Sequence, residues 1–169
     1  MNASDAICYV SLGDKRRRFP VETVKMILSG ARRAAREDRQ RLAQWLDGSG
    51  ALDLPDRSLE QLAAMHQAAR AGRYVPAAPL HCDLARGVGE TLDNGGDCDQ
   101  WAVVLLAALK LLEYPAYLVA GGDASDPYRH VWVRARAGGR WWDLDPKGSQ
   151  AGMDFGHSAD FERAQSWPL

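Results

Sequence analysis

Three side chains in the second half of the chain have the types that a cysteine-nucleophile reaction requires: Cys98, His130 and Asp145. In such reactions the sulfur attacks a carbonyl carbon, an imidazole transfers the proton, and a carboxylate orients the imidazole. The chemistry open to this set is acyl transfer through a thioester. Whether the three groups meet depends on the elements that carry them.

Cys98 is predicted to be the first residue of a helix. Two glycines precede Asp97, and Asp97 and Gln100 have the spacing of a capping box, which makes Asp97 the N-cap. The positive end of a helix dipole lowers the pKa of a thiol at this position, whereas the carboxylates of Asp97 and Asp99 raise it. We therefore expect an imidazolium partner to be needed to hold the thiolate. The alternative is a buried, unreactive cysteine on an apolar helix.

A predicted β-hairpin supplies that partner. The pair Gly138-Gly139 indicates a two-residue turn between strands 129–137 and 140–144. Opposite residues then have numbers that sum to 277, so Asp145 faces Trp132 and is the diagonal neighbour of His130, at a backbone separation of roughly 7–8 Å. The hairpin thus places His130 and Asp145 on one face. An exposed histidine on an edge strand is the alternative.

A metal site is the competing use of the same side chains. Cys98, His130 and Asp145 are all zinc-ligand types, but a structural zinc usually takes four ligands. Other acidic residues nearby lack the spacing of a calcium loop, namely Asp99, Asp123 and Asp126. We expect no metal and no cofactor.

The N-terminal half is predicted to be helical. One helix runs from Pro20 to Asp47, with an apolar stripe at three- and four-residue spacing. A second starts after Ser58, which forms a capping-box pattern with Gln61, and stops at Gly72. His66 lies on its apolar stripe, where a packed histidine is favoured over a ligand.

The C-terminal half is predicted to hold a buried helix on an antiparallel sheet. Residues 98–112 are apolar on nearly every face. Short strands are expected at 116–120, 129–137 and 140–144, the glycine-rich segment before Asp97 is expected to be loop or turn, and the tail from Lys147 has no clear pattern. The expected fold class is α+β, with an N-terminal helical extension (1–73) and a core (74–169).

Composition sets further limits. The chain has 169 residues and is 46% hydrophobic, which fits one globular domain, and its longest apolar run is nine residues, well short of the roughly 18 of a membrane span. Residues 1–73 hold 13 Lys/Arg against 9 Asp/Glu, and residues 74–169 hold 8 against 13. Because acids are interleaved with the bases of the first helix, a solvated face is favoured over a nucleic-acid surface.

Cysteine usage points to a reducing compartment. The three cysteines form no C-x-x-C pair, and no positively charged start precedes an apolar stretch near Met1. We therefore expect a cytoplasmic protein without a secretory signal, in which Cys8 and Cys82 are packed or free thiols.

Three segments together resemble the transglutaminase-like superfamily, and most closely its bacterial and phage-associated cysteine-protease-like branch. They are Gly-Asp-Cys-Asp at 96–99, Arg-His-Val-Trp-Val at 129–133 and Trp-Asp-Leu-Asp-Pro at 142–146. The resemblance covers residues 74–146. It implies a papain-like α+β core with Cys98 as nucleophile, His130 as general base and acid, and Asp145 as the residue that orients the imidazole.

The resemblance also implies a reaction class. The expected activity is amide-bond chemistry on a protein or peptide through a thioacyl intermediate, with hydrolysis favoured over amine transfer. The alternative is a non-catalytic structural or assembly protein of a phage or prophage particle, because the family has members without activity. The Cys98 backbone N–H is the expected oxyanion donor; the second donor is unassigned, and Tyr74 and Trp101 are guesses. We expect no membrane partner, no nucleic acid, and either packing on the core or self-association to cover the N-terminal helix.

Overall fold

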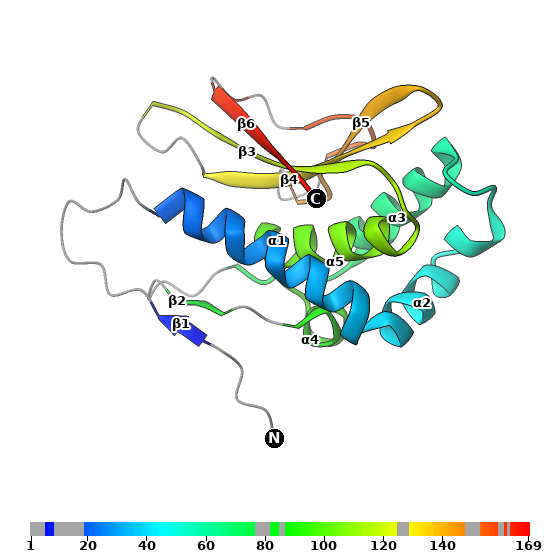
Figure 1. Cartoon of the computed structure of the whole chain (residues 1–169), viewed down its shortest axis with the longest axis horizontal. Coiled ribbons are helices and arrows are strands. Elements are labelled where there is room, and N and C mark those ends of the chain that lie inside the picture. Colours follow the sequence, from blue (N-terminus) through cyan, green and yellow to red (C-terminus); the bar gives the residue numbers. More distant parts are fainter. Residues whose placement is uncertain are drawn as a thin grey trace.

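The computed structural model describes residues 6–8, 19–76, 82–84, 87–124, 129–147, 153–158, 161 and 163–169. Helices cover one face of a four-stranded antiparallel sheet (Figure 1), which confirms the α+β class. In chain order the elements are β1 (Ala6–Cys8), α1 (Phe19–Glu37), α2 (Arg39–Gly48), the 3-10 turn η1 (Ala51–Asp53), α3 (Leu59–Ala71), β2 (Cys82–Leu84), α4 (Val88–Asn94), α5 (Cys98–Leu111), β3 (Ala116–Gly122), β4 (His130–Ala137), β5 (Arg140–Leu144) and β6 (Arg163–Pro168).

The sheet has the strand order β5-β4-β3-β6. The β4–β5 hairpin has the expected register, from Ala137 opposite Arg140 to Val133 opposite Leu144. Gly138 and Gly139 have φ angles of 57° and 78°, the left-handed conformation that a tight hairpin turn requires. Strand β6 was not expected; it pairs with β3, and its mixed polar sequence gives no alternation that could identify it.

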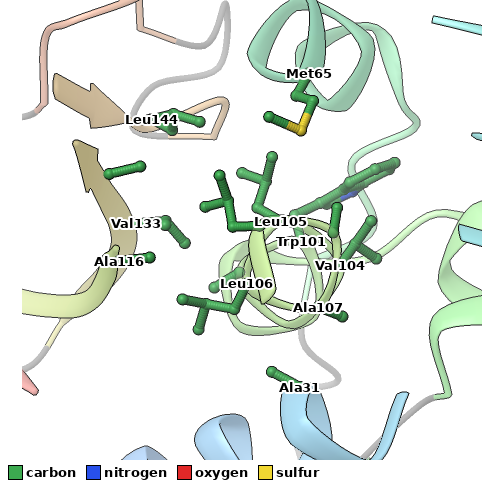
Figure 2. Packing of buried hydrophobic residues seen from close by; sticks show 14 of the residues in the cluster. Ala31, Met65, Trp101, Val104, Leu105, Leu106, Ala107, Ala116, Val133 and Leu144 are labelled. Atoms are coloured by element: carbon green, nitrogen blue, oxygen red, sulfur yellow. The ribbon is translucent and has the colours of Figure 1, made fainter. Parts of the chain in front are cut away.

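Helix α5 is the centre of the core. Figure 2 shows α5 residues such as Leu105 and Leu106 surrounded by Met65 of α3, Ala31 of α1 and Val133 of β4. One cluster of buried side chains joins α1, α2 and α3 to α5 and the sheet. The domain boundary expected after residue 73 stays a prediction. Among the described residues, no helix is both long enough and apolar enough to cross a bilayer.

The single helix expected over 20–47 is wrong. Asp38 has φ −101° and ψ 18°, and the helix is interrupted there, giving α1 and α2. In an unbroken helix the stripe that includes Ala35 would continue through Asp38 and Arg39, so the core would receive charged side chains. The interruption redirects the chain, and α2 buries Leu42 and Leu46 instead.

Two other local expectations need correction. The glycine-rich stretch before Asp97 is not all loop, because α4 forms there with Val88 and Thr91 buried. Gly72 does end α3, but its φ of −62° is not left-handed. A Cβ on Gly72 would lie 2.0 Å from Cζ2 of Trp101, so glycine is needed there for a close approach to that ring.

Candidate active site

The start of α5 holds Cys98 in a fixed place. The carboxylate of Asp97 accepts hydrogen bonds from the backbone N–H of Asp99 (3.1 Å) and of Gln100 (3.2 Å). Gln100 Oε1 accepts from the Asp97 N–H at 2.9 Å, so the expected capping box is complete. A Cβ on Gly96 would lie 2.6 Å from Gln100 Oε1, which explains the glycine there. Cys98 is therefore the first residue of a well-capped helix.

His130 and Asp145 meet, as the hairpin derivation predicted. Nε2 of His130 lies 2.8 Å from Oδ1 of Asp145. Asp145 is fully buried, and the His130 side chain is 11% exposed. Because Asp145 takes Nε2, Nδ1 is the ring nitrogen left to exchange a proton with another group.

The ladder ends earlier than the extrapolated pairing. Strand β5 stops at Leu144, so the backbone pair expected for Asp145 with Trp132 does not form. The carbonyl of Asp145 instead accepts the N–H of Met153 at 3.2 Å. The Asp145 side chain reaches the imidazole from a residue just beyond the strand.

The thiol of Cys98 lies beside the start of β4. The backbone amide of Val131, the residue after His130, lies close enough to the sulfur to lower the pKa of the thiol. The thiol itself donates to Oδ1 of Asp99 at 3.5 Å, and within the described part of the chain its hydrogen-bond partner is this carboxylate and not the imidazole. Cys98 thus lies at the start of α5 near the backbone of β4, while Asp145 reaches His130 from just beyond the end of β5.

The protonation state of Cys98 differs from our expectation. Burial, then the charges of Asp99 and Asp97, raise the pKa of the thiol well above its ordinary value, and the Val131 N–H only partly opposes them. Removing a thiolate from water beside two carboxylates is more costly than the helix dipole can offset. These surroundings favour a neutral thiol over the expected thiolate–imidazolium pair.

The two guessed oxyanion donors have different surroundings. The indole N–H of Trp101 donates to the carbonyl of Arg73 at 3.3 Å, so it is already engaged. Tyr74 is half exposed, and burial followed by the charges of Cys98, Asp97 and Asp99 raises the pKa of its hydroxyl. That electrostatic contact places Tyr74 near the thiol.

The zinc arrangement considered for this site is not formed. Among the described residues, the side chains whose ligand atoms lie within 4.8 Å of one another belong to Asp97, Cys98 and Asp99. His130 and Asp145 do not complete such a group with Cys98. The Asp97 carboxylate is also occupied as the helix cap. Asp126 and the side chains of Cys8 and Cys82 lie outside the described residues.

Comparison with known proteins supports the fold. No family model and no curated protein matches this chain. Among solved structures, the crystal structure of a TGase matches with a TM-score of 0.52 and 16% sequence identity, over 92% of this chain and 38% of that one. The fold is transglutaminase-like. The chain spans less than two fifths of that protein's length, and the likeness concerns the fold alone.

The hairpin register put Trp132 on the face of His130 without showing how the two rings meet. The ring of Trp132 lies against His130, with centroids 5.9 Å apart and planes 15° apart. The alternation of β4 had placed the two residues on one face, and that was the available signal. The same hairpin register sets Arg134 opposite Asp143, and Nε of Arg134 lies 2.7 Å from Oδ1 of Asp143.

His66 is buried, as expected for a packed histidine. It is 2% exposed, its ring meets Phe155 edge-on at 5.8 Å, and its Nε2 is buried without a hydrogen-bond partner. Burial lowers the pKa of its imidazole, against a hydrogen bond to the backbone of Asp145. This histidine is therefore close to the backbone of Asp145, the residue whose carboxylate lies against His130.

Proposed function

We propose that this chain is a cysteine enzyme that cleaves amide bonds of a protein or peptide through a thioester on Cys98. The observation that carries the proposal is the placement of His130. Its Nε2 lies 2.8 Å from a buried carboxylate oxygen of Asp145, and the backbone amide of the very next residue lies close enough to Cys98 to lower the pKa of its thiol. This supports a nucleophile, a base and a group that orients the base, the three roles that acyl transfer needs.

In the first half of the reaction the sulfur attacks the substrate carbonyl carbon. The thiol proton passes to Nδ1 of His130 and then to the departing amine, as the C–S bond forms and the C–N bond breaks. The backbone N–H of Cys98 at the start of α5 can donate to the developing oxyanion. Asp145 keeps the imidazole in the Nε2–H tautomer and stabilises its cation.

In the second half the thioester is resolved. Water gives up a proton to His130 and attacks the acyl carbon, the C–S bond breaks, and the proton returns to the sulfur. The net change is an amide plus water to an acid plus an amine. A primary amine in place of water would make the same intermediate yield a new amide, and we favour water.

The neutral thiol of the resting protein has a consequence for this scheme. Because the acidic neighbours raise the pKa of Cys98, the proton must move to His130 in the presence of substrate and not before. A general base of this kind contributes about 100- to 10,000-fold in rate.

The rival proposal is a non-catalytic structural or assembly protein that keeps the fold. The observation that favours it is again the thiol, which is partly buried and donates a hydrogen bond to Asp99. A protein of that kind would have no need of a free nucleophile.

An activated ester separates the two proposals. The full chain is mixed with p-nitrophenyl acetate, and intact mass and peptide mapping locate any acetyl group. We expect one acetyl group on Cys98 with release of one equivalent of nitrophenolate, and no such adduct in Cys98→Ala. Acetylation spread over surface lysines, equal in both proteins, would leave the structural role as the better description.

The fate of the acetyl group then distinguishes the two reactions. Adding a primary amine such as glycine methyl ester during turnover allows acetate and the acetylated amine to be quantified together. Acetate as the main product at millimolar amine supports hydrolysis. A dominant acetamide product would overturn that preference in favour of amine transfer, while leaving the thioester intact.

A further inference from the structure

Two aromatic rings that the proposed reaction has not used lie next to His130. The ring of Trp132 stacks on His130, and the ring of Phe161 lies 5.6 Å from Trp132 and 5.9 Å from His130. Trp132 is 3% exposed, so its indole is held firmly in this place. The indole of Trp132 therefore covers one face of the His130 ring.

A carboxylate holds the indole in its plane. Nε1 of Trp132 donates to Oδ1 of Asp143 at 3.1 Å. Asp143 in turn accepts two hydrogen bonds from Arg134, at 2.7 and 2.9 Å, and one from the hydroxyl of Ser158 at 3.2 Å. A bidentate guanidinium–carboxylate pair has a defined geometry, so the carboxylate oxygen that accepts the indole N–H is held in place.

Strand β3 leaves space for these rings at Gly121. Gly121 of β3 is the register partner of His130. A Cβ on Gly121 would lie 2.7 Å from Phe161 and 3.0 Å from Cη2 of Trp132. Because Gly121 has no side chain, the rings of Trp132 and Phe161 can lie close to this strand, next to the histidine.

We propose that Trp132, fixed by the Arg134–Asp143 pair, is a positioning residue that sets the plane of the His130 ring. This inference rests on the proposed function. Asp145 holds one nitrogen of the ring, but a single hydrogen bond leaves rotation about it free. The stacked indole removes that freedom, so Nδ1 stays directed toward the proton that it must accept. Its electron-rich face also favours the imidazolium that forms during the reaction.

Four variants and two readouts test this role. Trp132→Leu removes the ring, Trp132→Phe keeps a ring without the N–H, and Gly121→Ala displaces the rings without changing a polar group. Trp141→Leu is the matched control, because Trp141 lies on the neighbouring strand and is 43% exposed. The readouts are the tautomer of His130, from nitrogen-15 ring spectra, and the rate of Cys98 acetylation by p-nitrophenyl acetate.

We expect wild type and Trp141→Leu to show one sharp Nε2–H tautomer. Trp132→Leu and Gly121→Ala should show exchange-broadened or mixed tautomers and acetylate about tenfold or more slowly, while Trp132→Phe should keep most of both signals. The inference is overturned if Gly121→Ala and folded Trp132→Leu keep the wild-type tautomer and the wild-type rate.

Failure of the proposed function has a different signature. In that case His130→Gln would acetylate at Cys98 as fast as wild type, whatever the tautomer spectra show. The tautomer readout still decides whether Trp132 and Gly121 position the ring. The two ideas can therefore fail separately.

Discussion

At the scale of single residues, the state of the Cys98 thiol governs how the site can react. Cys98 is partly buried, and a carboxylate lies on each side of it in the sequence, so the neutral form is favoured. The sequence showed both carboxylates, but it did not show how far the thiol is removed from water. That is why the direction of the pKa shift could not be obtained from the motif.

Asp99→Asn should make Cys98 more reactive. The amide cannot carry the negative charge that raises the pKa of the thiol, so more thiolate is present at pH 7. We expect iodoacetamide to alkylate Cys98 about three- to tenfold faster, measured by peptide mass mapping. The control is Asp53→Asn, at an exposed residue of η1. An unchanged or lower rate in Asp99→Asn would contradict the electrostatic explanation.

His66 should make the fold sensitive to acid. Burial, helped by the charge of Arg70, lowers the pKa of its imidazole in the folded chain against the opposing charges of Asp145 and Asp154, while in the unfolded chain the value is about 6.5. Below pH 6.5 the unfolded chain therefore binds a proton that the folded chain does not, and the free energy of unfolding falls.

Urea unfolding at pH 7.5 and pH 5.0 measures this effect. His66→Leu should lose less stability than wild type between the two pH values. His157→Leu is the control, because His157 is exposed, and it should behave as wild type does. An equal loss in His66→Leu and wild type would show that His66 does not contribute to the acid sensitivity.

At the scale of elements, the hairpin was predictable from the sequence, whereas the break between α1 and α2 and the strand β6 were not. Gly138-Gly139 between two alternating strands determines a register, and that register was sufficient to bring His130 and Asp145 together. The interruption at Asp38 depends on which side chains the core can accept, and β6 depends on a partner strand distant in sequence. Such long-range contacts leave no local signal in the sequence.

Gly72→Ala should destabilise the junction of α3 and α5. The added methyl group would lie 2.0 Å from a ring atom of Trp101, and that ring is only 2% exposed and cannot move aside. We expect a loss of about 1–3 kcal/mol in the free energy of unfolding, measured with urea. Gly48→Ala is the matched control, since nothing lies within 4 Å of its Cβ position. Equal midpoints for the two variants would mean that the close approach to Trp101 carries no energetic cost.

At the scale of the whole molecule, the N-terminal helices and the sheet share one core through α5. Ile27 and Ala31 of α1, and Leu42 of α2, are buried in the same cluster as the α5 side chains. The sequence indicated a helical layer with an apolar stripe, and the structure shows what covers that stripe. Helices and sheet should therefore unfold together.

Deletion of residues 1–50 tests this dependence. The deletion removes α1 and α2 and exposes one side of α5. We expect the shortened chain to aggregate or to lose its cooperative unfolding transition, as seen by size-exclusion chromatography and urea unfolding. A monomeric fragment that unfolds at the same midpoint as the full chain would show that the first two helices are dispensable.

The most direct measurement of the central claim is the rate of Cys98 acetylation in wild type and in His130→Gln at pH 7. If His130 accepts the thiol proton, the variant should acetylate at least about 100-fold more slowly, because the thiol is otherwise neutral at that pH. His157→Gln, at an exposed histidine, should match wild type. Equal rates in wild type and His130→Gln would contradict the proposed enzyme and leave a protein with a transglutaminase-like fold and an unactivated cysteine.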